Sequence, residues 1–100
     1  MTLPFLRWQI FETQDPNIES IGDVFDAEVL AMKAIGLTNV QNQSSGDVIG
    51  QGSDVFCAAG ALRCGNTFSI IVIVTGNNGS SVTSTLNKLV KEIPKHLPNL

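Results

Sequence analysis

The stretch of sequence that decides the fold reads VFCAAGALRCGNTFSIIVIVT and occupies residues 55–75. Two segments of strand length, residues 55–62 and 67–75, flank Gly65-Asn66, a dipeptide that favours a two-residue hairpin turn with positive φ angles. The stretch therefore predicts a β-hairpin in which Cys64 pairs with Thr67. Successive pairs then set Cys57, Ala59 and Ala61 against Val74, Val72 and Ile70 on one face, and Ala58, Gly60 and Leu62 against Ile73, Ile71 and Ser69 on the other.

Both faces of this hairpin are apolar, and Arg63 is the only charged residue between positions 55 and 76. A strand that is apolar on both sides needs cover on both sides. Two helices cover only one face of a small sheet, so we expect a homodimer or larger ring built on the open face or on an edge strand. The residues taken as the candidate interface are Cys57, Ala59, Ala61, Ile70, Val72 and Val74. A monomer with one helix on each face is the alternative.

The segments around the hairpin predict the remaining elements. Residues 5–11 alternate in the manner of a strand. Asp15-Pro16 predicts the start of a helix. Apolar residues at helical spacing continue to Ile35, and Gly36 is expected to end this helix. Residues 37–45 predict an ordered loop or an edge strand, and residues 47–50 a short strand. A second helix is expected to begin after Ser80 or Ser81 and to end or kink at Pro94.

These elements predict a single α+β domain over residues 1–100. It has two layers, with an antiparallel sheet of about four strands in the order β-α-β-β-β-α and both helices on one face. Too little chain follows Pro94 for the final strand of a ferredoxin-like plait. The β-β-β-α ending, with its Gly/Asn turn before the last helix, resembles the dimerising roadblock and profilin-like modules, but their N-terminal hairpin is missing. The resemblance concerns the fold and implies no activity.

Composition restricts the class of protein. Only 15% of the 100 residues are charged, against about 25% in average soluble domains. A net charge of −3 disfavours binding to nucleic acid or to an anionic membrane. The longest apolar run, Ile70-Ile71-Val72-Ile73-Val74, is far shorter than the roughly 20 residues of a membrane-spanning helix.

The N-terminus does not resemble a signal peptide, so a cytoplasmic location is expected. Cys57 and Cys64 lie roughly 23 Å apart if they share one strand, which is too far for a disulfide. Unpaired cysteines favour a reducing compartment.

A glycine-rich turn offers a speculative binding site for an anion. It joins the hairpin to the second helix, where backbone N–H groups and the helix dipole attract phosphate or carboxylate groups. Its residues are Gly76, Asn77, Asn78, Gly79, Ser80 and Ser81. Glycine and asparagine are equally the ordinary residues of a turn.

Catalytic groups are sparse. Cys64 is a candidate thiol, His96 is the only histidine, and Glu19, Asp23 and Asp26 share one face of the first helix at i, i+4 and i+7. Nothing in their spacing brings them together, and no catalytic residue, metal site or cofactor is predicted. The sequence thus favours a non-enzymatic oligomeric interaction or regulatory module; a sensor of small anions and a small enzyme using Cys64, His96 or the acidic helix residues are the alternatives.

Overall fold

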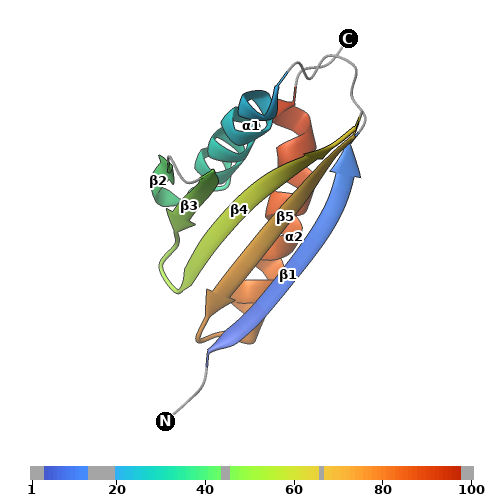
Figure 1. Ribbon diagram of the computed structural model, residues 1–100. Helices are drawn as coiled ribbons and strands as arrows, with labels where there is room; N and C mark the ends of the chain where they lie inside the picture. Colours follow the sequence, from blue (N-terminus) through green and yellow to red (C-terminus); the bar gives the residue numbers. More distant parts are fainter. Residues whose placement is uncertain (1–3, 14–19, 44–45, 66, 98–100) are drawn as a thin grey trace.

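The structure is a computed structural model that describes residues 4–13, 20–43, 46–65 and 67–97. In chain order the elements are β1 (Phe5–Thr13), α1 (Ile21–Ala34), β2 (Thr38–Asn42), β3 (Asp47–Gln51), β4 (Val55–Cys64), β5 (Thr67–Gly76) and α2 (Gly79–His96). The strands form one antiparallel sheet in the order β1-β5-β4-β3-β2. Figure 1 shows α1 and α2 together on one side of that sheet.

The predicted α+β class, with both helices on one face, is confirmed, but the strand number is corrected from about four to five. The additional strand is β2, in the segment predicted as a loop or edge strand. Its sequence, TNVQN, has little β propensity, and it pairs with β3 alone through an irregular register. β2 is an edge strand, and its formation depends more on the pairing with β3 than on the β propensity of its own residues.

The β4–β5 hairpin has the predicted register. Cys64 pairs with Thr67, and the pairs continue through Ala59 with Val72 to Val55 with Gly76. Gly65 has a φ of +63°, as a two-residue turn with positive φ angles requires, while Asn66 lies outside the described residues. The Thr67 hydroxyl donates a hydrogen bond of 2.8 Å to the Cys64 carbonyl across the turn.

The first helix ends as predicted, whereas the residues of its expected start are not among those that the structure describes. Asp15 and Pro16 lie outside the described residues, and α1 begins at Ile21 after the N-cap Ser20. The Ser20 N–H donates to the Asp23 carboxylate at 3.3 Å. Gly36 follows the helix with a φ of +90°, a conformation that glycine adopts without steric cost.

The second helix corrects two details. Its N-cap is Asn78, not Ser80 or Ser81, and Pro94 lies inside the helix, which continues to His96. Proline has no N–H, so the last turn of α2 lacks one backbone hydrogen bond at Pro94. Ile93 and Leu97 flank Pro94 in the sequence and are both buried. Their packing in the core therefore holds this last turn in place.

The core lies between the two helices and the sheet. Its buried apolar side chains are Val24, Ala27, Ala31 and Met32 of α1, Val48, Val55, Cys57, Ala59, Phe68, Ile70, Val72 and Val74 of the sheet, and Val82, Leu86, Leu89, Ile93 and Leu97 from α2 onward. Glu28 of α1 is buried among them with 0% exposure. Neither of its carboxylate oxygens has a hydrogen-bond partner, and burial raises the pKa of Glu28 from 4.5 to about 8. The Glu28 carboxyl group is therefore neutral at pH 7.

This burial predicts a pH-dependent stability. Between about pH 4.5 and pH 8 the folded chain retains the Glu28 proton while the unfolded chain releases it. The free energy of unfolding should therefore fall by up to about 1.4 kcal/mol per pH unit across this window, with no further loss from this group above it. In urea denaturation across the window, Glu28→Gln should remove this dependence, because glutamine does not ionise. Parallel pH profiles of the two proteins would contradict the assignment.

Candidate functional site

The two faces of the sheet have different environments. The face beneath the helices carries Cys57, Ala59, Ala61, Ile70, Val72 and Val74, the residues predicted as an interface. Ala61 is partly buried, and the other five are buried in the core of the single chain. Because the helices already cover these side chains, a partner on the sheet would meet the alternate residues of the same strands.

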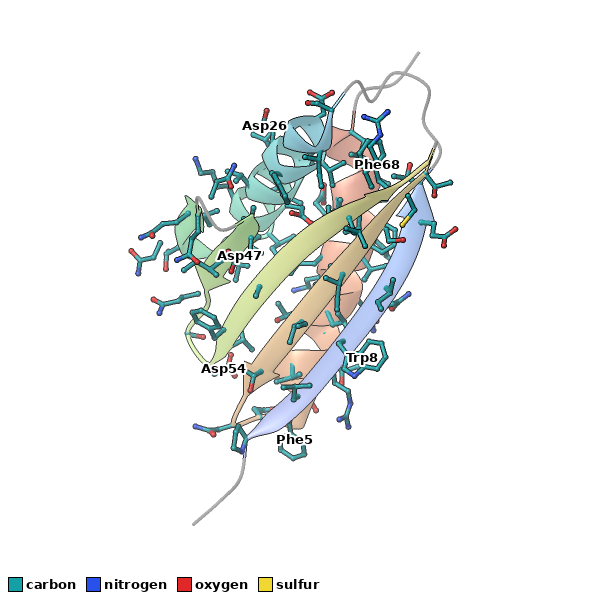
Figure 2. All side chains as sticks on the ribbon, in the orientation of Figure 1. Phe5, Trp8, Asp26, Asp47, Asp54 and Phe68 are labelled. Atoms are coloured by element: carbon teal, nitrogen blue, oxygen red, sulfur yellow. The ribbon has the colours of Figure 1, made fainter. Side chains whose placement is uncertain are left out.

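We call these alternate residues the open face. Its most exposed apolar side chains are 39–64% accessible to solvent: Leu6, Trp8 and Ile10 of β1 and Phe56 and Leu62 of β4. Half-buried Ala58 of β4 and Ile71 and Ile73 of β5 lie between them, and half-buried Ile49 lies beside Ala58 on β3. Figure 2 shows Trp8 standing out from β1 beside the sheet.

Few charges reach the open face. In the strand registers, Glu12 and Asp47 are the only charged residues that share this face. Arg63, the one charged residue of the hairpin, lies on the other face, with its guanidinium 5.4 Å from the centre of the Phe68 ring. The open face is consequently an apolar surface with acidic groups at its margins.

A depression of about 390 Å³ interrupts the open face above Gly60. Its walls are formed by Ile10, Gly46, Gly60, Ala61, Leu62, Ser69 and Ile71. Such a volume falls within the roughly 300–1,000 Å³ of pockets that hold small organic groups. Two of the lining residues, Gly46 and Gly60, have no side chain to fill the depression.

The turn predicted as an anion site is largely occupied by its own hydrogen bonds. The Asn78 side-chain oxygen accepts from the N–H groups of Ser80 and Ser81 at 2.9 and 3.1 Å. The backbone carbonyl of Asn78 accepts from the Val82 N–H at 3.0 Å. A second depression, of about 520 Å³, lies beside Gly76 and Asn77, and Asp54 contributes to its lining. A carboxylate there opposes the approach of an anion.

The N-cap at Asn78 yields a direct stability test. Asn78→Ala should lower the free energy of unfolding by about 1 kcal/mol, because two N–H groups of α2 lose their acceptor. The matched control is Asn77→Ala, at an exposed neighbouring position outside the helix. Chemical denaturation of both variants measures the difference, and equal stabilities would contradict a capping role for Asn78.

The candidate catalytic groups do not form one site among the described residues. Cys64 is exposed and shares the open face, whereas His96 lies in the helix layer, where its Nε2 is 3.2 Å from the Glu92 carboxylate. Asp23 takes part in the start of α1, Asp26 is exposed, and Glu19 lies outside the described range. Figure 2 labels Asp26 on α1, in the helix layer.

The two cysteines are both free, and they differ in environment. Cys57 is buried, which raises the pKa of its thiol to about 11 and leaves it protonated at neutral pH. No three His, Cys, Asp or Glu side chains cluster as a metal site in the part of the chain that the structure describes. Cys57 is thus a small core residue.

Comparison with models of known protein families and with curated proteins gives no match for this sequence. Within the described ranges, neither helix has the length and apolar character needed to cross a membrane. The function must therefore be inferred from the surface of the chain.

The sequence grouped the hairpin residues of the open face but left undecided which side of β1 joins them. β1 alternates Phe5, Arg7, Gln9 and Phe11 with Leu6, Trp8 and Ile10, so both of its sides carry large apolar residues. Pairing of Trp8 with Ile73 puts the side with Leu6, Trp8 and Ile10 away from the helices. The sequence shows the alternation of β1, but which of its sides faces the helices depends on the pairing with β5.

Proposed function

We propose that this protein is a small non-enzymatic interaction module that forms a homodimer or larger homo-oligomer through its open face. The observation that carries the proposal is the set of large apolar side chains that β1 turns away from the helices. Phe11 lies on the helix side of the sheet with Arg7 and Gln9 and packs against the core, while Leu6, Trp8 and Ile10 are more than half exposed on the open face. A strand that is apolar on both sides is favoured when both sides are buried, so the open side of β1 calls for another molecule.

The size of the open face supports the proposal. Its five most exposed apolar side chains together present on the order of 500 Å² of surface, given the areas that aliphatic and aromatic side chains bury. This value is near the upper end for the largest patch on a typical monomer, about 300–600 Å². With the half-buried isoleucines and the polar margin, the face approaches the roughly 800 Å² that each partner buries in a standard interface.

The chemistry of the face favours a second copy as the occupant. Interfaces of homodimers are more apolar than transient interfaces between different proteins, and they contain few charges at their centre. The centre of the open face, around Ile71 and Ile73, carries no charged residue. A strongly charged partner would find no opposite charge at this centre.

The anion-sensor alternative receives less support from the geometry. Asn78 already accepts hydrogen bonds from two N–H groups of the turn, and Asp54 stands beside it. An enzyme is likewise disfavoured, because Cys64 and His96 lie on opposite layers of the fold. Self-association requires neither a ligand nor a catalytic group.

A matched pair of lysine substitutions tests the proposal. Leu62 is 64% exposed on the open face, and Leu30 is 49% exposed on α1, in the opposite layer. A lysine at either position keeps its charge in water in the single chain, so both variants should fold. Leu62→Lys should raise the dissociation constant of the oligomer tenfold or more, because association would bury the ammonium group. Leu30→Lys should leave it unchanged.

Light scattering after size exclusion, at tens of micromolar, measures the outcome. The wild-type chain should elute with a mass of at least twice its 10.7 kDa, and Leu62→Lys should shift toward the monomer. A wild-type monomer at these concentrations overturns the proposal. Equal effects of the two substitutions would place the interface away from the open face.

A further inference from the structure

The open face carries a large projecting aromatic side chain and a hollow. Trp8, the only tryptophan of the chain, is 60% exposed on β1. The hollow lies above Gly60 on β4, between the side chains of Ile10 and Leu62. Both features belong to the same face, because Trp8 pairs with Ile73 and Gly60 pairs with Ile71.

We propose that two copies pack face to face about a two-fold axis, with Trp8 of each copy seated in the Gly60 hollow of the other. This inference rests on the proposed function, since it names how the second copy occupies the open face. In a two-fold dimer, any projection that fills a hollow does so twice, so one surface supplies both halves of the contact. The knob and the hollow thus make the open face complementary to itself.

The strand registers locate the axis. Trp8 and Ile73 lie in one row across the sheet, and Ile10, Ile71 and Gly60 lie in the next row on the same face. Trp8 and Gly60 are therefore separated by two strand spacings and one pleat repeat, roughly 10 Å across and 7 Å along the strands. The midpoint falls over β5, between Ile71 and Ile73. These two isoleucines would meet their own counterparts at the centre of the dimer.

The hollow also meets the chemical needs of an indole. A tryptophan buries up to about 250 Å² and, when buried, its N–H requires an acceptor. The Gly46 carbonyl oxygen lies 4.0 Å from the position that a Cβ would take on Gly60, so an acceptor borders the hollow. The remaining walls, Ile10, Leu62 and Ile71, supply apolar contacts to the ring.

Glycine at position 60 is not required by the folded single chain. A Cβ there would meet only the Ile71 side chain at 3.6 Å and the Gly46 oxygen at 4.0 Å, which are ordinary contacts. Gly76 differs, because a Cβ there would collide with the Asp54 carbonyl oxygen. Glycine in a strand interior weakens the strand and often marks a close approach of another group. At Gly60 that group is the indole of the second copy.

Complementation between two variants tests the arrangement. Trp8→Ala removes the knob and keeps the hollow, whereas Gly60→Val fills the hollow and keeps the knob. Each variant alone should associate at least tenfold more weakly than the wild-type chain. A mixed dimer regains one contact, in which Trp8 of the Gly60→Val chain enters the hollow of the Trp8→Ala chain. The equimolar mixture should therefore associate more tightly than either variant alone.

Fluorescence reads this contact directly, because the Trp8→Ala chain contains no tryptophan. Titrating it into the Gly60→Val chain should shift the tryptophan emission to shorter wavelength as the indole leaves water. The matched control is a titration with the double variant Trp8→Ala/Gly60→Val, which lacks the hollow and should produce no shift. Circular dichroism confirms that each variant is folded; if Gly60→Val is not, Gly60→Ala takes its place.

The outcomes separate the two proposals. A wild-type dimer without complementation or an emission shift overturns the knob-in-hollow arrangement and leaves self-association standing. A wild-type monomer at tens of micromolar overturns both. Equal shifts with the hollow-filled control would show that the indole meets another part of the open face, which also overturns the inference.

Discussion

The pairing of Cys64 with Thr67 across the Gly65 turn determines the environment of every side chain in the two longest strands. From that pair, Ile70, Val72 and Val74 point toward the helices, and Ile71 and Ile73 point to the open face. A slip by one residue would exchange the two sets, because side chains alternate along a strand. The turn chemistry therefore decides which isoleucines form the core and which are left to meet another molecule.

The two apolar faces of the sheet are built in different ways. The helix-covered face uses small residues such as Cys57 and Ala59, and β3 approaches α1 so closely that a Cβ on Gly50 would stand 2.9 Å from the Met32 sulfur. Such contacts give the dense packing of a protein interior. The open face combines large projecting side chains with a hollow at Gly60. These projections and the hollow give the open face a shape that a partner can fit, whereas the helices already cover the other face.

Local chemistry made part of the structure predictable from sequence. The hairpin register followed from Gly65-Asn66, and the end of α1 followed from Gly36, since both depend on neighbouring residues. The inclusion of Pro94 in α2 depends instead on the burial of Ile93 and Leu97, which results from tertiary packing. The open face was hardest to assign, because the hairpin is apolar on both sides and only the position of the helices distinguishes them. Glu28 lies four residues from both Val24 and Met32, so helical spacing put it on the buried stripe, but a carboxylate is ordinarily exposed.

The place of β1 in the sheet has a consequence for the order of folding. β4 and β5 are adjacent in the chain and close through a tight turn, but β1 pairs with β5 from the opposite end of the chain. Contacts between distant segments must overcome a larger loop-closure entropy, and they form more slowly than local ones. During synthesis β1 is therefore made well before the strand with which it pairs. Until β5 emerges, Leu6, Trp8 and Ile10 have no sheet to join, so the N-terminal strand is the segment that most needs protection from premature association.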